Sequence, residues 1–286
     1  MINSLELILY LPLINVSFPG LIVLVYSVLI PISTVDIIPE SVTLHIFNLS
    51  ADLKNNNGNK LELLNKESTI TILNLGSIFY FFLLTLLIYS LIGIFYKKIS
   101  LKFLEFINKK NQKQNLIVIF YQGYFEILLA VYLNDQLKIN DTRIDVASNL
   151  LGYFLGLCSV TLIPAIFIYV MNIPVESLRT VVTKKSFDKM YEELKYWYKP
   201  ALANNLVYLA RRLAMVTVFF AKFFTDNVVI QIITLIYIQA ASIMYVFAHK
   251  PFIGKLNMFV EFVNEVTILI STESMLLYTE VLTPDQ

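Results

Sequence analysis

Long runs of apolar residues, separated by short polar segments, dominate the pattern along this chain. A helix needs about 20 mostly apolar residues to cross the roughly 30 Å apolar core of a bilayer. Four runs reach this length, and we predict transmembrane helices near residues 13–32, 70–96, 147–171 and 228–249. Lipid offers the backbone no hydrogen bonds, so each of these segments is expected to be α-helical.

Two weaker segments complete the predicted set of spans. Residues 116–133 are apolar except for Glu126, and residues 206–225 carry basic side chains near both ends. If both segments cross, 16 of the 22 Lys and Arg residues lie on one side of the membrane and six on the other. Basic residues gather on the cytoplasmic side of membrane proteins, so this distribution predicts six spans with a cytoplasmic N-terminus.

The apolar segment 257–277 is harder to place, because it contains several carboxylates. It fits a seventh span, a re-entrant or interfacial helix, or a helix lying along the bundle. By helical spacing, Asn257, Glu261, Asn264 and Glu265 share one face of this segment. The predicted arrangement therefore has six spans and a candidate seventh membrane helix at the C-terminus.

Composition supports this pattern. Hydrophobic residues make up 57% of the 286 residues and charged residues 15%, against about 25% charged residues in soluble domains. The predicted fold class is all-α, a polytopic transmembrane helix bundle forming a single domain over residues 1–286. The net charge of +1 gives no indication of a nucleic-acid partner. The expected partners are the lipid bilayer and either further copies of this chain or subunits of a membrane complex.

Ionisable and amide side chains at membrane depth are the main functional candidates. Such groups are costly in lipid, so each is a functional hypothesis by default. Carboxylates and amides along one helix face suit a cation path, which makes Glu126, Asn257, Glu261, Asn264 and Glu265 a candidate ion pathway. The alternative is structural: the acidic face packs against basic loops, and Glu126 is satisfied by a partner.

Other polar residues predict contacts at the membrane surface. Arg211, Arg212 and Lys222 lie near the ends of an apolar segment, where long basic side chains reach the lipid headgroups. Asn48 and Asn140 begin two N-glycosylation sequons in predicted outer loops, and they are the glycosylation candidates.

Four local features predict helix packing and shape. Gly152 and Gly156 form a GxxxG pattern, which allows a close approach of a second helix. Pro164 is expected to kink the segment that contains it. In residues 186–198 the aromatic and apolar side chains form one helical stripe with charges opposite, which predicts an amphipathic helix that Pro200 is expected to end.

Enzymatic chemistry has the least support. Cys158 is the only cysteine, and the two histidines have no companion ligands at metal-binding spacing, so neither a metal site nor a cofactor is predicted. No phosphate-binding glycine loop or nucleophile motif is present. We therefore predict a membrane protein that is not an enzyme.

Short stretches spread over nearly the whole chain carry a family resemblance. They are Ile2-Asn3-Ser4-Leu5-Glu6-Leu7, Leu11-Pro12-Leu13, Val16-Ser17-Phe18-Pro19, Asp36-Ile37-Ile38-Pro39, Ile72-Leu73-Asn74-Leu75-Gly76, Tyr124-Phe125-Glu126, Arg211-Arg212, Pro251-Phe252 and Asn264-Glu265. They resemble the C-terminal multi-pass membrane region of ciliate cysteine-rich surface proteins with furin-like or EGF-like repeats. That region is itself loosely similar to the six-helix module of TRP and polycystin proteins, which is associated with cation conduction.

The resemblance implies a TRP-like cation channel or sensor module in the plasma membrane or another cellular membrane. The disulfide-rich ectodomain of the family has no counterpart here, which implies a fragment or a shortened paralogue. Two other functions fit the same pattern. One is a non-conducting anchor or scaffold of a surface or organellar complex, and the other is an accessory subunit of a respiratory complex.

Overall fold

A computed structural model of the chain describes residues 2–14, 16, 18–33, 40–46, 71–95, 117–118, 120–136, 143–178, 180, 187, 189–191 and 193–279. Every named element in these ranges is a helix, and the isolated β-bridge found there joins Leu194 to Phe252. The predicted all-α fold class is therefore confirmed. The two glycosylation candidates, Asn48 and Asn140, lie outside the described residues.

The elements follow one another along the chain as a series of helices of very different lengths. They are α1 (Ile2–Leu9), η1 (Leu11–Leu13), α2 (Gly20–Ser33), α3 (Glu40–Ile46), α5 (Thr71–Leu75), α6 (Ser77–Phe95), α9 (Tyr124–Gln136), α10 (Arg143–Leu157), the π-helical turn η3 (Cys158–Leu162), α11 (Ile163–Asn172), α12 (Val175–Leu178), α14 (Lys199–Leu202), α15 (Asn204–Phe220), α16 (Lys222–Thr225), α17 (Val228–His249), α18 (Lys255–Ser274) and η4 (Met275–Tyr278).

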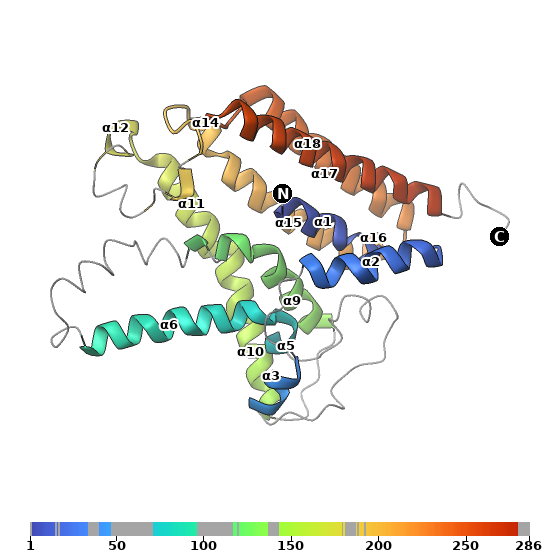
Figure 1. The fold of residues 1–286 in the computed structure, drawn as a ribbon, viewed down its shortest axis with the longest axis horizontal. Helices are drawn as coiled ribbons and strands as arrows, with labels where there is room; N and C mark the ends of the chain where they lie inside the picture. Colours follow the sequence, from blue (N-terminus) through green and yellow to red (C-terminus); the bar gives the residue numbers. More distant parts are fainter. Residues whose placement is uncertain are drawn as a thin grey trace.

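Five helices form the centre of the molecule. The hairpin of α17 and α18 packs on α15 and on the N-terminal helix α1, while α15 also contacts α9 (Figure 1). Fully buried apolar side chains from these helices fill the space between them, among them Leu7, Phe125, Phe219, Ile232 and Ile268. Segments from the two ends of the chain thus share one apolar core.

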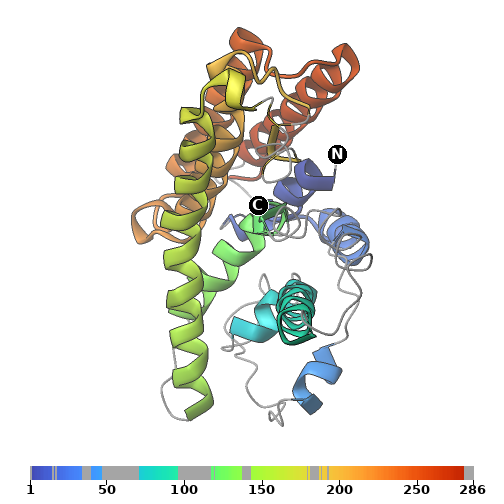
Figure 2. The same cartoon turned by 90° about the vertical axis from the view of Figure 1, so that its left-hand side faces the viewer.

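The helices α10 and α11 form one long rod, joined through the π-helical turn η3 (Figure 2). The amide of Ile163 donates to the carbonyl of Cys158, five residues earlier. The next residue, Pro164, has no N–H to donate and its ring crowds the preceding turn, so a local widening of the helix is expected there. The kink expected at Pro164 stays a prediction; the structure has this π turn directly before the proline, and the rod continues beyond it.

The GxxxG pattern lies where α10 meets α9. A Cβ atom at Gly152 would lie 3.0 Å from Asn134 Nδ2 and 3.3 Å from Thr71 Oγ1, and one at Gly156 would lie 3.0 Å from a Val131 methyl carbon. All three distances are shorter than ordinary van der Waals contact. The predicted close approach of a second helix at these two glycines is confirmed.

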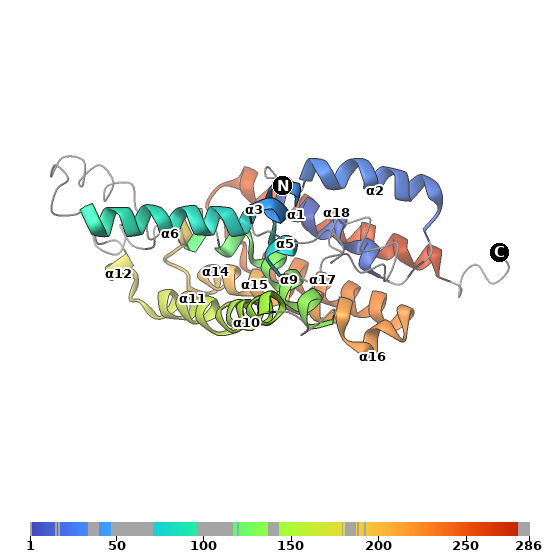
Figure 3. The ribbon, with the colours of Figure 1, turned by 90° about the horizontal axis from the view of Figure 1, so that it is seen from below.

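The predicted helix over 70–96 is divided in two. Gly76, with φ at 53°, separates the short helix α5 from α6, because this backbone conformation is comfortable mainly for glycine. Near its start, α6 packs against α9 and α10, with the rings of Phe82 and Phe120 5.2 Å apart. The rest of α6 extends away from the central helices (Figures 1 and 3).

Two helices in the described part of the chain are long and apolar enough to cross a membrane, where the sequence predicts six or seven. They are Val146–Asn172, through η3, and Val228–His249. Three of the other predicted membrane segments form shorter or more polar helices. The helix α9 has 13 residues after a break at Gly123, α15 has 17 residues before a break at Ala221, and α18 carries Lys255 and three glutamates.

The amphipathic helix predicted over 186–198 is wrong as a continuous element. Helical turns occur at residues 187 and 189–191, but residues 193–195 instead pair with the turn after α17. The Lys195 amide donates to the Pro251 carbonyl at 2.8 Å, and the Ile253 amide donates to the Glu193 carbonyl at 3.0 Å.

Pro200 stands in the first turn of α14, where its missing N–H costs nothing, so it begins a helix and does not end one.

Candidate functional site

Two adjacent arginines in α15 occupy the centre of the molecule. Arg211 is 6% exposed and Arg212 is fully buried, although α15 is otherwise largely apolar. Neighbouring residues on an α-helix point about 100° apart, so the two guanidinium groups meet different helices. A buried arginine is costly unless it is paired, and each of them has an acidic partner.

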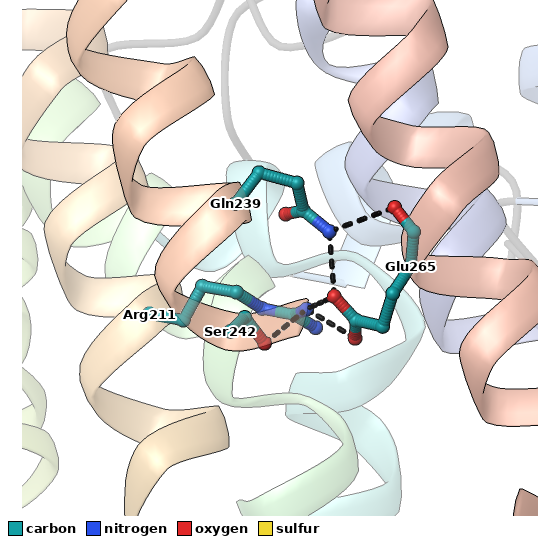
Figure 4. Close-up of polar contacts among 4 residues, drawn as sticks. All are labelled: Arg211, Gln239, Ser242 and Glu265. Carbon is teal, nitrogen blue, oxygen red and sulfur yellow. Dashed lines mark hydrogen bonds and ion pairs between the residues drawn. The ribbon is translucent and has the colours of Figure 1, made fainter. Parts of the chain in front are cut away.

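Arg211 forms an ion pair with Glu265 of α18, which is 2% exposed (Figure 4). Its Nη1 group donates to both carboxylate oxygens and, at 3.2 Å, to Ser242 Oγ of α17. The Gln239 side-chain amide of α17 donates to the same carboxylate and, at 3.1 Å, to the Glu265 main-chain carbonyl. Three helices are therefore joined through one carboxylate.

Arg212 forms a second ion pair, with Glu6 of α1, at 2.9 Å between Nη2 and Oε2. Its guanidinium lies 4.4 Å from the centre of the Tyr208 ring and 5.6 Å from that of Phe125. Aromatic faces attract such cations, and the attraction is stronger where water is excluded. We refer to Glu6, Arg211, Arg212 and Glu265 as the ion-pair core.

A chain of aromatic and amide contacts leads from the ion-pair core toward one end of α15. The Tyr208 ring stacks on Tyr121 with centroids 4.7 Å apart, and the Tyr121 hydroxyl donates to Asn205 Oδ1 at 3.2 Å. Asn205 in turn donates to the Met190 carbonyl. This network fixes the start of α15 against the residues that precede it.

The five residues of the predicted ion pathway are not gathered in one place. Glu265 lies in the ion-pair core, and Asn264 beside it is buried, while Glu261 is half-buried one turn earlier. Asn257 is exposed near the start of α18. Glu126 lies on α9. Its carboxylate accepts a hydrogen bond from the hydroxyl of Tyr10, which lies between α1 and η1.

The three residues predicted to contact lipid headgroups differ in their exposure. Arg211 and Arg212 are buried among protein atoms and paired with carboxylates, so neither is placed to contact a headgroup. The physical reason is that Glu265 and Glu6 supply in the interior the negative charge that the sequence reasoning assigned to lipid. Lys222 is exposed in α16, so its headgroup contact stays a prediction.

Sequence reasoning missed three residues of this site: Glu6, Gln239 and Ser242. Glu6 appears in the sequence analysis only within a stretch that carries the family resemblance. The other two lie three residues apart, hence on one face of the apolar helix α17. The available signal was charge balance. Two arginines in an apolar helix require buried acids, and few carboxylates lie in apolar surroundings.

Among the described residues there is no group of three or more His, Cys, Asp or Glu side chains able to hold a metal ion. Cys158 is half-buried in η3, away from the ion-pair core. What the arrangement can do is hold four helices together, because two ion pairs join α15 to α18 and α1, and hydrogen bonds of Gln239 and Ser242 add α17.

Comparison of the chain with known proteins gives no match. No family model, no curated protein and no solved structure matches the chain.

Proposed function

We propose that this chain is a multi-pass helical membrane protein that acts as a non-conducting anchor or scaffold within its membrane. The observation that carries the proposal is the position of Glu265. This carboxylate is one of the five residues of the candidate ion pathway, yet Arg211 neutralises its charge and Gln239 also donates to it. A carboxylate held in this way has little capacity left to bind a passing cation.

Exposed apolar surface supports the membrane location. In each of the two helices long enough to cross a bilayer, only 28% of the most apolar 18-residue window is buried in the protein. Large side chains such as Leu150, Phe154, Tyr237 and Met244 face outward from these helices. An apolar surface of this kind on long helices is unfavourable in water and favourable in lipid.

The placement of basic residues fits a crossing of the membrane by α17, which is part of the same proposal; the six-span arrangement with a cytoplasmic N-terminus is proposed from the sequence. Residues 193–195 and 250–253 meet at one end of α17, and Lys222 lies beyond its other end. The charge distribution in the sequence requires this separation, because it assigns the first two segments to the cytoplasm and Lys222 to the outer side.

The TRP-like channel is the competing function. It requires a hydrated path through the membrane, and Glu261 is its best remaining candidate because it is half-buried on α18, one turn from Glu265. Neutralising this carboxylate would then change ion flux. The two functions therefore differ in a measurable property of the folded protein.

The test is a flux assay on the full chain reconstituted into sealed phosphatidylcholine vesicles, with helical content checked by circular dichroism. We expect sodium, potassium and calcium flux equal to that of protein-free vesicles over a wide range of imposed voltage, while a known ionophore gives full flux. A flux that Glu261→Gln or Glu265→Gln alters, and that the exposed control Glu273→Gln leaves unchanged, would replace the scaffold with a channel.

Membrane integration is tested separately, by alkaline extraction of membranes from cells that express the chain. We expect the protein to stay in the membrane pellet and to be released by detergent. Recovery in the alkaline supernatant would contradict both the scaffold and the channel.

A further inference from the structure

A pocket of about 530 Å³ is lined by residues from the end of α17 and the start of α18. This end of α17 is the one opposite α16 (Figure 1). Ten described residues line the pocket, of which three are lysines and none is acidic. The lysines come from three different segments: Lys195 precedes α14, Lys250 follows α17, and Lys255 begins α18. We call this pocket the basic groove.

Lys195 is held in place at the groove. Its ammonium group donates to the main-chain carbonyl of Lys250 at 2.7 Å. That carbonyl lies at the C-terminal end of α17, where the helix dipole favours a positive charge. A lysine carries three N–H donors, so the ammonium keeps donors for a ligand in the groove.

Lys250 adopts a backbone conformation that favours glycine over lysine. Lys250 ends α17 in the left-handed conformation, with φ at 43°, the position that glycine usually occupies after a helix. A lysine in this conformation costs free energy that a glycine would avoid. Strain of this kind is a reason to look for function, and here it places a positive charge on the wall of the groove.

The start of α18 adds to the positive potential. Gly254 is its N-cap residue and forms no side-chain capping bond with the first amides of this 20-residue helix. Uncapped N–H groups at the start of a long helix attract anions. Gly254, Lys255 and Met258 of this first turn line the groove.

The rest of the groove is apolar and open to the surroundings. Phe247 is 65% exposed and Phe259 is 64% exposed, and both line the groove together with Phe262. The exposed face of α17 continues from Phe247 to Met244, one turn earlier. Positive charge at one end and exposed aromatic rings at the other match a molecule with an anionic head and a long apolar chain.

We infer that the basic groove binds an anionic phospholipid of the surrounding bilayer, with its headgroup phosphate on Lys195, Lys250 and Lys255 and its acyl chains against Phe247 and Phe259. The inference rests on the proposed membrane location. Charge complementarity favours an anionic over a zwitterionic lipid, because cytoplasmic leaflets carry anionic lipids that attract basic clusters. A volume of about 530 Å³ is within the range of pockets that hold small ligands.

The test measures lipid binding to the purified full chain in detergent micelles by native mass spectrometry. Phosphatidylserine and phosphatidylcholine with identical acyl chains are titrated separately. The test variant is Lys250→Gly with Lys255→Gln, because glycine suits the left-handed position and the second lysine is exposed. The matched control, Lys189→Gln with Lys199→Gln, removes the same charge from two exposed lysines outside the groove.

We expect the wild type and the control to bind phosphatidylserine at least about tenfold more tightly than phosphatidylcholine, and the test variant to lose this preference. A Phe247→Ser variant should weaken binding of both lipids alike. Equal binding of the two lipids by the wild type, or an unchanged preference in the test variant, would overturn the inference.

Two further results separate the alternatives. If inorganic phosphate at millimolar concentration displaces phosphatidylserine completely and Phe247→Ser has no effect, the groove is a site for soluble anions and the lipid assignment is wrong. Failure of membrane integration in the alkaline extraction contradicts the proposed function. Loss of lipid preference in a protein that does integrate contradicts only the inference about the groove.

Discussion

At the scale of single residues, the packing of the central helices depends on the carboxylates that pair with two buried arginines. Arg211 and Arg212 are neighbours in sequence, yet they pair with Glu265 near the C-terminal end and Glu6 near the N-terminal end of the chain. The pairs remove unpaired charge from the interior, and they join α15 to α18 and α1. Removing one partner of such a pair is expected to cost far more than removing both.

We expect Arg211→Met to lower the free energy of unfolding by about 3–5 kcal/mol, because it strands the Glu265 carboxylate at a site that is 2% exposed. Glu265→Met should have a similar effect on Arg211. The double variant Arg211→Met with Glu265→Met should lose much less than the sum of the single losses. Denaturant unfolding in detergent micelles, followed by far-ultraviolet circular dichroism, provides the measurement.

The control for this cycle pairs residues that do not touch. Combining Arg211→Met with Glu273→Gln, an exposed residue of α18, should give additive losses within about 0.5 kcal/mol. If the Arg211 and Glu265 substitutions also prove additive, the ion pair does not couple α15 to α18.

At the scale of elements, the contact of α10 with α9 depends on the absence of side chains at two positions of α10. The side-chain amide of Asn134, which faces Gly152, donates to Asn149 at 3.0 Å, and Ser148 Oγ accepts from the Thr71 amide at 2.8 Å. These buried hydrogen bonds hold Asn134 and Thr71 in place. A methyl group at Gly152 therefore meets neighbours that cannot move without losing a bond.

We expect Gly152→Ala to destabilise the protein by about 1–3 kcal/mol, despite the better helix propensity of alanine, because the added methyl overpacks this contact. The matched control is Gly20→Ala at the start of α2, where nothing lies within 4 Å of the added atom. That variant should be neutral or slightly more stable. Thermal unfolding in detergent distinguishes the two, and equal melting temperatures would mean that α9 and α10 do not pack closely.

At the scale of the whole molecule, α17 separates two ends of different character. Its 22 residues, at 1.5 Å each, span about 33 Å, close to the thickness of the apolar core of a bilayer. The basic groove lies at one end and α16, with Lys222, lies at the other. In a protein that crosses the membrane through α17, these ends face different compartments.

Single cysteines introduced in a Cys158→Ser background test this separation. We expect Ile253→Cys to react with a membrane-impermeant maleimide only from the cytoplasmic side, and Phe223→Cys only from the outer side of sealed vesicles. Both positions suit labelling, since Ile253 is 49% and Phe223 is 66% exposed. Reaction of both cysteines from the same side would show that α17 does not cross, and exchanged sides would reverse the predicted orientation.

Much of the fold follows from local sequence, because apolar periodicity and backbone chemistry act over a few residues. The span predicted at 228–249 coincides with α17, and Gly152 and Gly156 mark a real helix contact. Errors arose where a local feature had more than one structural meaning. Gly76 divides an apolar run that reads as one helix, and Pro200 begins a helix that it was expected to end.

The sequence by itself determined the all-α class, the positions of the apolar helices and the presence of costly charges among them. It did not determine which charges meet. Arg211 and Glu265 lie 54 positions apart, and Gln239 and Ser242 enter their contact from a third helix. Only the tertiary structure decided these pairings, because the energy of a buried ion pair depends on distance and exclusion of water, and neither is a property of spacing along the chain.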